Sequence, residues 1–299
     1  MPRPKRHHFV PRSYLEGFVD PESGCLHAYD KVSGNYWTPK PKNVMVIKDY
    51  YKQQVPDGID PDILEKKLGE SLESEIKSSF SKLVNNPCTL TNEDTANILT
   101  YLELQHTHVP RQVELSKRFS KTGRLRRALQ ETFPELGMGE STLAYSDHFR
   151  FDFIKMFWGT FAHYFACMNW DVVKAPRTCS FITSDSPVSF YNIAFPPPTE
   201  AGPGLVGTMV LFPLDSQHFL VLQHPEYVSG TITTATEKIP ADALKPEEFD
   251  LTYGKVVDKE QVYRLNYIML HLSHRIIVGK NRDILEKAID PCLLDDLIN

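Results

Sequence analysis

The sequence predicts an α+β protein whose helix-rich N-terminal half packs on a mostly antiparallel sheet from the C-terminal half. Two observations support this fold class. Before residue 170, apolar residues recur at helical spacing in several long segments. After Asp171, short strand-like runs separated by proline and glycine replace them. Because there is no internal repeat, we expect one globular unit over 1–299, with a helix-rich part and N-terminal hairpin at 1–170 and a strand-rich part at 171–299.

The N-terminal elements are expected to be short. A helix and then two strands of a hairpin are predicted at 10–18, 26–31 and 35–38. Pro11 suits the first turn of the helix, and Gly17 stands near its end. Ser33-Gly34 suits the hairpin turn between the strands. Residues 43–51 are expected to form a connection.

Three long helices are expected next, at 60–84, 91–110 and 146–170. The first follows a capping Asp60. The second opens at Thr91-Asn-Glu-Asp, which resembles a capping box, and Pro110 should end or kink it. The third has a phenylalanine at every fourth position, a stripe that predicts burial in the core: Phe149, Phe153, Phe157, Phe161 and Phe165.

A basic stretch lies between the second and third helices. From Arg111 to Arg127 there are seven basic residues against one acid, Glu114, although the whole chain has a net charge of -5. We expect a helix here over about 117–130, interrupted at Gly123. Such a stretch is either a solvated helix face or a surface that attracts a polyanion. The candidate RNA-binding residues are Lys117, Arg118, Arg124, Arg126 and Arg127.

The C-terminal half should contain strands, a helix, a further strand and a last short helix. The strands are expected at 180–183, 208–212 and 219–222, followed by the helix at 258–273 and the strand at 275–278.

Composition limits the class of protein. With 299 residues, 41% hydrophobic and 24% charged, the chain can bury a large core, and disorder throughout is excluded. The five cysteines are widely spaced and include no Cys-x-x-Cys pair, which favours reduced thiols in the cytoplasm. Neither a signal region nor an apolar run of about 18 residues is present, so we expect no membrane partner. Phosphate-binding loops are also absent, and no cofactor is expected.

The string from His7 to Phe18 resembles the opening of a large bacterial and fungal family catalogued as a domain of unknown function. The hallmark of that family is His-His-x-Val-Pro-x-x-Tyr-Leu followed by Phe. The resemblance continues at Gln105 with Pro110-Arg111, at 181–188 and at 212–214, and so covers most of the chain. His108 departs from the pattern, since such proteins often have arginine there. Family membership implies a shared site, and some fungal enzymes that make arginine-containing cyclic dipeptides from aminoacyl-tRNA look similar.

The residues themselves suggest where that site lies. Adjacent histidines on an extended segment point to opposite sides, so either His7 or His8 can line a site, unless both belong to a frayed end. Ser184-Asp185 ends a strand before Ser186-Pro187, which suits a site, although Asp185 could instead bond backbone N–H groups of a turn. Gln105 and His108 share a helix face, where either could equally be a buried structural residue.

We therefore predict an enzyme with an RNA-linked substrate, most plausibly aminoacyl-tRNA, that performs acyl transfer. His7 or His8 would be the general base, and Asp185 would orient that base or the substrate amine. Gln105 and Arg111 would position the acyl group or the terminal phosphate. The predicted substrate-binding residues are Glu73, Gln105, Arg111 and Ser184.

Two alternatives stay open. In the first, the protein is a nuclease in which a divalent ion bound by His7, His8, Glu73 and Asp185 activates water. His271 and His274 have i,i+3 spacing and could join such a His/carboxylate site, although no spacing demands a metal. In the second, the protein is a binding module without catalysis.

Overall fold

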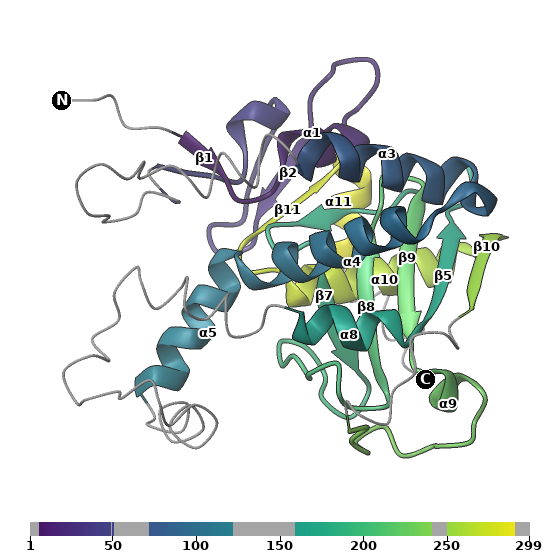
Figure 1. The fold of residues 1–299 in the computed structure, drawn as a ribbon. Coiled ribbons are helices and arrows are strands. Elements are labelled where there is room, and N and C mark those ends of the chain that lie inside the picture. The colour runs from purple at the N-terminus through teal and green to yellow at the C-terminus, as the bar shows by residue number, and fades with distance from the viewer. Residues whose placement is uncertain (1–5, 49, 51–71, 122–158, 241–249, 291–299) are drawn as a thin grey trace, which may run out of the picture.

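Two sheets and the helices around them form the described part of the chain. The computed structural model describes residues 6–48, 50, 72–121, 159–240 and 250–290, and every structural statement below concerns these residues. Figure 1 shows α3, α4 and α8 on the near face of the larger sheet and α10 on its far face.

The helices, including three 3-10 helices marked η, are α1 (Arg12–Leu15), η1 (Glu16–Phe18), η2 (Pro41–Asn43), α3 (Leu72–Asn85), η4 (Pro87–Thr89), α4 (Asn92–Thr107), α5 (Pro110–Lys121), α8 (Thr160–Ala166), α9 (Pro225–Val228), α10 (Lys259–Leu272) and α11 (Arg282–Ile289). The strands are β1 (Arg6–His8), β2 (His27–Asp30), β3 (Asn35–Trp37), β4 (Val46–Lys48), β5 (Asn169–Lys174), β6 (Thr183–Ser184), β7 (Ser189–Asn192), β8 (Thr208–Pro213), β9 (His218–Gln223), β10 (Leu251–Val256) and β11 (Ile276–Gly279).

The larger sheet has five strands in the order β10-β5-β9-β8-β7, and the smaller has four in the order β3-β2-β11-β6. All these pairings are antiparallel except that between β10 and β5. The α+β prediction is therefore confirmed. The expectation that the sheet comes from the C-terminal half holds for the larger sheet only, because β2 and β3 come from the N-terminal half.

The larger sheet buries both of its faces, except at the edge strand β10, because apolar residues occupy consecutive positions on its other strands. Val210 and Phe212 of β8 pack with the apolar faces of α3, α4 and α8. Leu211, which points to the opposite side, packs with α10 and α11. A third cluster joins Phe9, Val10 and the α1 region to β2 and β11. The N-terminal segment is thereby anchored against the smaller sheet.

The expected capping box fixes the start of α4. Thr91 accepts a hydrogen bond from the Asp94 N–H at 3.2 Å, and the Asp94 carboxylate accepts one from the Thr91 N–H at 2.9 Å. The helix ends at Thr107, and Pro110 begins α5. Figure 1 shows α5 extending away from the two sheets.

Other boundaries differ from the sequence prediction. The helix expected over 146–170 is described only from Gly159, and α8 ends at Ala166 because the chain enters β5 at Asn169, between β9 and β10. Of that phenylalanine stripe, Phe161 and Phe165 pack in the core, and the other three lie outside the described residues. The first twelve positions of the helix expected over 60–84 also lie outside them.

The prediction of a strand over 180–183 is largely wrong. Only Thr183 and Ser184 form β6. The preceding segment is held by a side chain, since Asn266 of α10 accepts from the Ile182 N–H and donates to the Ser180 carbonyl, each at 3.0 Å. The short or exposed strands β1, β4, β7 and β10 were not expected.

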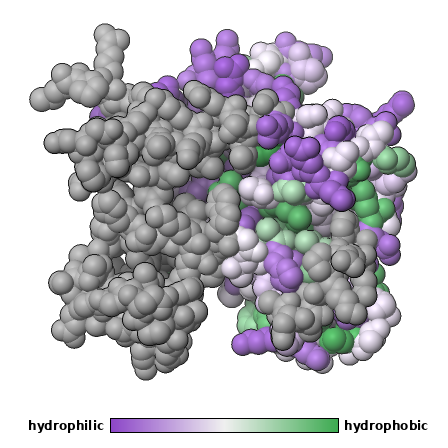
Figure 2. Space-filling view, in the orientation of Figure 1, coloured by the Kyte–Doolittle hydropathy of each residue, from purple (hydrophilic) through white to green (hydrophobic). Residues whose placement is uncertain are grey.

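The surface of the described residues is mixed in character. Hydrophilic side chains surround small groups of hydrophobic ones on the face shown in Figure 2, and exposed large apolar residues include Val32, Ile193 and Val256. Within the described ranges, no helix is both long and apolar enough to cross a membrane. The cysteines in those ranges are free thiols: Cys25, Cys88, Cys167 and Cys179.

Candidate functional site

Charged and polar side chains that are buried, or half-buried in the case of Lys31, gather where α4 ends, α5 begins and the chain turns after β6. This group, called the polar centre below, consists of Lys31, Gln105, His106, Arg111, Asp185 and Glu200. Burying such groups is costly unless each one is hydrogen-bonded or paired, so their partners indicate what each residue does.

His106 is fixed in one neutral form. Its ring stacks on Phe190 with centroids 3.9 Å apart. Nδ1 lies 3.1 Å from the Val188 carbonyl and therefore donates, while Nε2 lies 3.1 Å from the Gln112 amide nitrogen and therefore accepts. Burial lowers the pKa of His106, against the opposing charge of Glu200. The ring is thus a structural connector between α4, α5 and the turn after β6.

Arg111 and Glu200 form a buried ion pair. The Glu200 carboxylate lies 3.6 Å from Arg111 Nε and accepts from the Phe190 N–H at 2.9 Å and from the Gln112 amide at 3.1 Å. Arg111 Nη2 donates to the Pro198 carbonyl at 2.9 Å. Arg111 Nη1 is buried and has no hydrogen-bond partner within the described residues. A desolvated guanidinium with one open nitrogen is suited to bind a carbonyl, carboxylate or phosphate oxygen.

Lys31, which sequence reasoning missed, supplies a second positive charge. It follows β2, and its Nζ donates to the carbonyls of Leu270 and Ser273 at the end of α10. Burial lowers the pKa of Lys31; the charge of Asp185 opposes this, and that of Arg111 adds to it. Lys31 thus lies within electrostatic range of both residues. The sequence around Lys31 does not indicate this role, because the carbonyl groups that it contacts lie some 240 residues away in the sequence.

Asp185 stabilises the corner between α10 and β11. Its carboxylate accepts hydrogen bonds at 2.8 Å from the backbone N–H groups of His274, Arg275 and Ile276. Burial raises the pKa of Asp185, and these bonds oppose that shift. The arrangement matches the turn that the sequence offered as the alternative. The expected contact of Asp185 with His7 or His8 stays a prediction. Ser184 accepts from the Ser186 N–H at 3.0 Å within the same turn.

The histidine pair lies in β1, so it is not part of a frayed end. His7 is buried and His8 is half-buried. Burial lowers the pKa of His8, despite hydrogen bonds to the backbone of Pro41 and Lys42 that act in the opposite direction. Its Nε2 is buried without a hydrogen-bond partner in the part of the chain that is described. At pH 7 the His8 ring is therefore neutral, and the described residues leave the hydrogen-bonding capacity of its buried Nε2 unused.

The N-terminal segment is attached to α4 directly after this pair. Gln105 Nε2 and His108 Nε2 both lie 3.0 Å from the Phe9 carbonyl. His108 Nδ1 also contacts the Leu104 carbonyl. His108 thus fixes the backbone next to His8. Gln105 Oε1 is buried and has no partner among the described residues.

For several predicted site residues the structure describes no side chain. Glu73 lies in α3, and Lys117 and Arg118 lie in α5, but their side chains are outside the described residues, as are Arg124, Arg126 and Arg127 entirely. His271 packs on Tyr267 with ring centroids 4.1 Å apart, and His274 is exposed. Where the structure describes side chains, no three His, Cys, Asp or Glu residues converge as metal ligands. The metal set that includes Glu73 stays a prediction.

Comparison with known proteins gives one match. A family model described as "Protein of unknown function (DUF4238)" matches residues 6–283. No curated protein and no solved structure matches the chain significantly.

Proposed function

The chain belongs to the DUF4238 family, and from this premise we propose that its polar centre binds the acyl end of an aminoacyl-tRNA and promotes acyl transfer to an amine. The observation that supports the proposal most directly is the buried Arg111 guanidinium, whose Nη1 has no partner among the described residues. The reaction class rests on the resemblance between this family and some fungal enzymes that make cyclic dipeptides from aminoacyl-tRNA.

In this proposal, Arg111 stabilises negative charge on the substrate. When an amine attacks the ester carbonyl of an aminoacyl-tRNA, the carbonyl oxygen becomes negative. A donor already held in place by Glu200 and Pro198 needs little reorganisation to stabilise that oxygen or a neighbouring phosphate. Lys31 adds positive charge to the same region, and the open Gln105 Oε1 can accept from the attacking amine.

His8 is the better candidate for the base. Its lowered pKa keeps the ring neutral at pH 7, and its Nε2 is open in the described region. The attacking nitrogen forms a C–N bond and loses a proton to Nε2. The ester C–O bond breaks, and that proton passes to the departing ribose oxygen. Asp185 acts in this scheme as a positioning residue, because its hydrogen bonds to backbone N–H groups hold the corner beside Lys31.

α5 leads from the polar centre into the predicted RNA surface. If Lys117 and Arg118 contact phosphates, the logarithm of tRNA affinity should fall by about 0.7–0.9 per contact for each tenfold rise in salt.

The test is a transfer assay with purified protein and tRNA charged with radiolabelled amino acids, followed by mass spectrometry of the products. His8→Ala should abolish release of the amino acid from tRNA. Arg111→Lys keeps the positive charge but loses the planar guanidinium group with its several N–H donors. This variant should lower the rate by about 10²–10³, the usual effect of removing one donor that stabilises the negative charge of the transition state. The matched control is Arg177→Gln at an exposed arginine, which should leave the rate unchanged.

Other outcomes would favour the alternatives. Cleavage of the RNA chain that stops on addition of a chelator would support the metal-dependent nuclease. Stoichiometric tRNA binding with no release of amino acid from any charged pool would contradict acyl transfer and support a binding module.

A further inference from the structure

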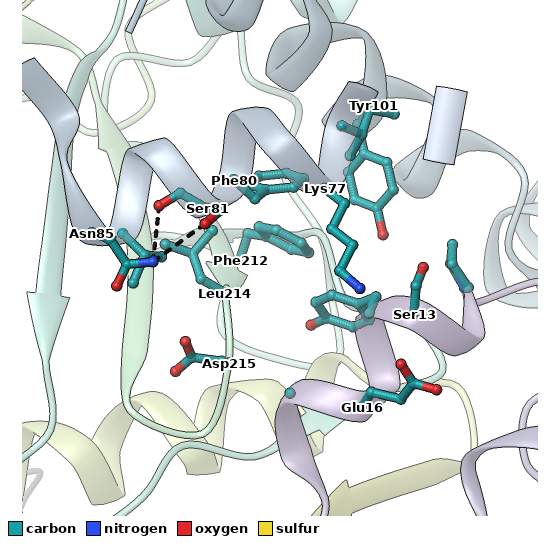
Figure 3. A pocket seen from close by; sticks show the side chains of 15 residues that line it. Ser13, Glu16, Lys77, Phe80, Ser81, Asn85, Tyr101, Phe212, Leu214 and Asp215 are labelled. Atoms are coloured by element: carbon teal, nitrogen blue, oxygen red, sulfur yellow. Dashed lines mark hydrogen bonds between the residues drawn. The ribbon is translucent and has the colours of Figure 1, made fainter. Parts of the chain in front are cut away.

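A cavity lies apart from the polar centre, between α1, α3 and the end of β8. Its volume is about 330 Å³, at the small end of the roughly 300–1,000 Å³ typical of small-molecule sites. Figure 3 shows the side chains that line it. No member of the polar centre lines it, so the inference below does not depend on the proposed function.

One side of the pocket is aromatic and apolar. Tyr14 stacks on Phe212 with ring centroids 5.2 Å apart, and Phe80 lies 5.5 Å from Phe212. Phe212 is fully buried, so the accessible wall consists of the partly exposed Tyr14 and Phe80 together with Val84 and Leu214. The Tyr14 hydroxyl contacts Thr183 Oγ1 at 2.7 Å and donates to the Pro213 carbonyl at 2.8 Å, which fixes its ring. A rigid wall of this kind suits the face of a flat apolar group.

Three charged side chains line the pocket, and they differ in whether they have a partner of opposite charge. Glu16 is paired with Arg12 at 3.1 Å, and Asp215 lies 3.0 Å from His218 Nδ1 while also accepting from backbone N–H groups. Lys77 forms no ion pair among the described residues. Figure 3 shows its side chain extending from α3 across the pocket toward α1. The two carboxylates therefore have cationic or hydrogen-bonding partners, whereas the Lys77 ammonium has none among the described residues.

From these features we infer that the pocket is a binding site for a small carboxylate with a flat, apolar body. The ring of the ligand lies against Tyr14, Phe80 and Leu214. Its carboxylate faces Lys77 Nζ, the charge that the described residues leave without a counter-ion. An amine with the same ring meets Lys77 as a like charge, and an alcohol with the same ring gains no ion pair.

The test uses three probes that share a phenyl ring: phenylacetate, phenethylamine and phenethyl alcohol. Binding to the full-length protein is measured by isothermal titration and by ligand-observed NMR. We expect phenylacetate to bind about fivefold more tightly than the alcohol, the advantage of one partly exposed ion pair, and the amine to bind most weakly. Lys77→Gln should remove the preference for the carboxylate, whereas Lys174→Gln, at an exposed lysine on β5, should keep it.

A second variant tests the location of the site independently of charge. Ser81 is exposed on α3 and lines the pocket, so Ser81→Phe should fill its entrance without changing the core and should abolish binding of phenylacetate. The inference would be overturned by tighter binding of the amine, by equal binding of all three probes, by no binding of any at millimolar concentration, or by unchanged binding to the Ser81 variant.

Discussion

The Asp185 carboxylate accepts from three successive backbone N–H groups. Asparagine in the same place offers one oxygen and turns an N–H group toward other N–H groups, so donors would face donors. We expect Asp185→Asn to lower the free energy of unfolding by about 3 kcal/mol, since hydrogen bonds to a buried charged group are lost. Urea denaturation at pH 7 measures the change.

The matched control for Asp185 is Asp171→Asn. Asp171 accepts from the Thr252 hydroxyl at 2.7 Å near the surface, and its replacement should change stability by no more than about 0.5 kcal/mol. If both variants unfold at the same urea concentration, the carboxylate of Asp185 is not needed for the fold, and a direct role in catalysis becomes the better interpretation.

Gly207 offers a second test at a single residue. A Cβ atom added there would lie 2.4 Å from the Cβ and 2.5 Å from the Cα of Ala235. Gly207→Ala should therefore destabilise the protein by about 1–3 kcal/mol, the usual cost of overpacking. Gly202, earlier in the same loop, has no atom within 4 Å of an added Cβ. Gly202→Ala should leave the thermal unfolding midpoint nearly unchanged. Equal midpoints for the two variants would show that the loop moves to accommodate the added Cβ atom at residue 207.

Among the elements, α3 and α4 are joined by Asp94. Its carboxylate accepts from Lys82 Nζ at 2.7 Å, from Ser79 Oγ at 2.9 Å and from the Thr91 N–H at 2.9 Å. The hydrogen bonds from Lys82 and Thr91 hold the pKa of Asp94 well below its usual range. The folded protein therefore keeps this charge at pH values where the unfolded chain takes up a proton.

The stabilisation from Asp94 should depend on pH in a defined direction. It is fully present above the usual aspartate pKa of about 4 and is lost as the pH falls below it. We expect the difference in unfolding free energy between the wild type and Asp94→Asn to be largest near pH 7 and to shrink between pH 4 and pH 2.5. A difference that stays constant over this range would contradict the shifted pKa.

Local sequence signals predicted some elements well and others poorly. The capping box at Thr91, the hairpin turn at Ser33-Gly34 and the two strands β8 and β9 follow from patterns within a few residues. β5 was missed because the aromatic Trp170 follows closely on the phenylalanine stripe that ends at Phe165, and only pairing with β9 and β10 makes this segment a strand. β10 has mostly exposed residues and so lacks the alternation that marks a half-buried strand.

The residues of the candidate site also fall into those that local sequence signals predicted and those that they did not. Gln105, Arg111 and Asp185 were found through motif and position at the end of an element. Lys31 and Glu200 were missed because they join the polar centre through contacts with segments distant in sequence. The sequence left two roles open for Asp185, and only the fold shows that its carboxylate bonds backbone N–H groups.

At the scale of the whole molecule, four histidines of the described ranges have a lowered pKa for the same leading reason, which is burial: His8, His106, His224 and His271. The unfolded chain binds protons at these rings more readily than the folded protein does. Their stabilisation is therefore present above the usual histidine pKa of about 6.5 and is lost as the pH falls below it.

We expect the free energy of unfolding to decrease from pH 7.5 to pH 5.5, before most carboxylates titrate. The raised pKa of Asp185 acts in the opposite direction, so a variant is needed to identify the histidine contribution. In His224→Gln the amide can still donate to the Pro203 carbonyl, as Nε2 does at 2.7 Å, and the decrease should be shallower. Equal slopes in the two proteins would assign the pH dependence to other groups.

The order of strands in the smaller sheet has a consequence for biosynthesis. β2 and β3 leave the ribosome early, but their neighbour β11 is among the last segments to be translated. Until then, the β2 edge and the apolar residues around Phe9 have no partner on that side, and closing so long a loop is slow. The N-terminal hairpin of β2 and β3 therefore lacks its neighbouring strand β11 during most of translation. A ribosome stalled before residue 276 should present that hairpin in a protease-sensitive state.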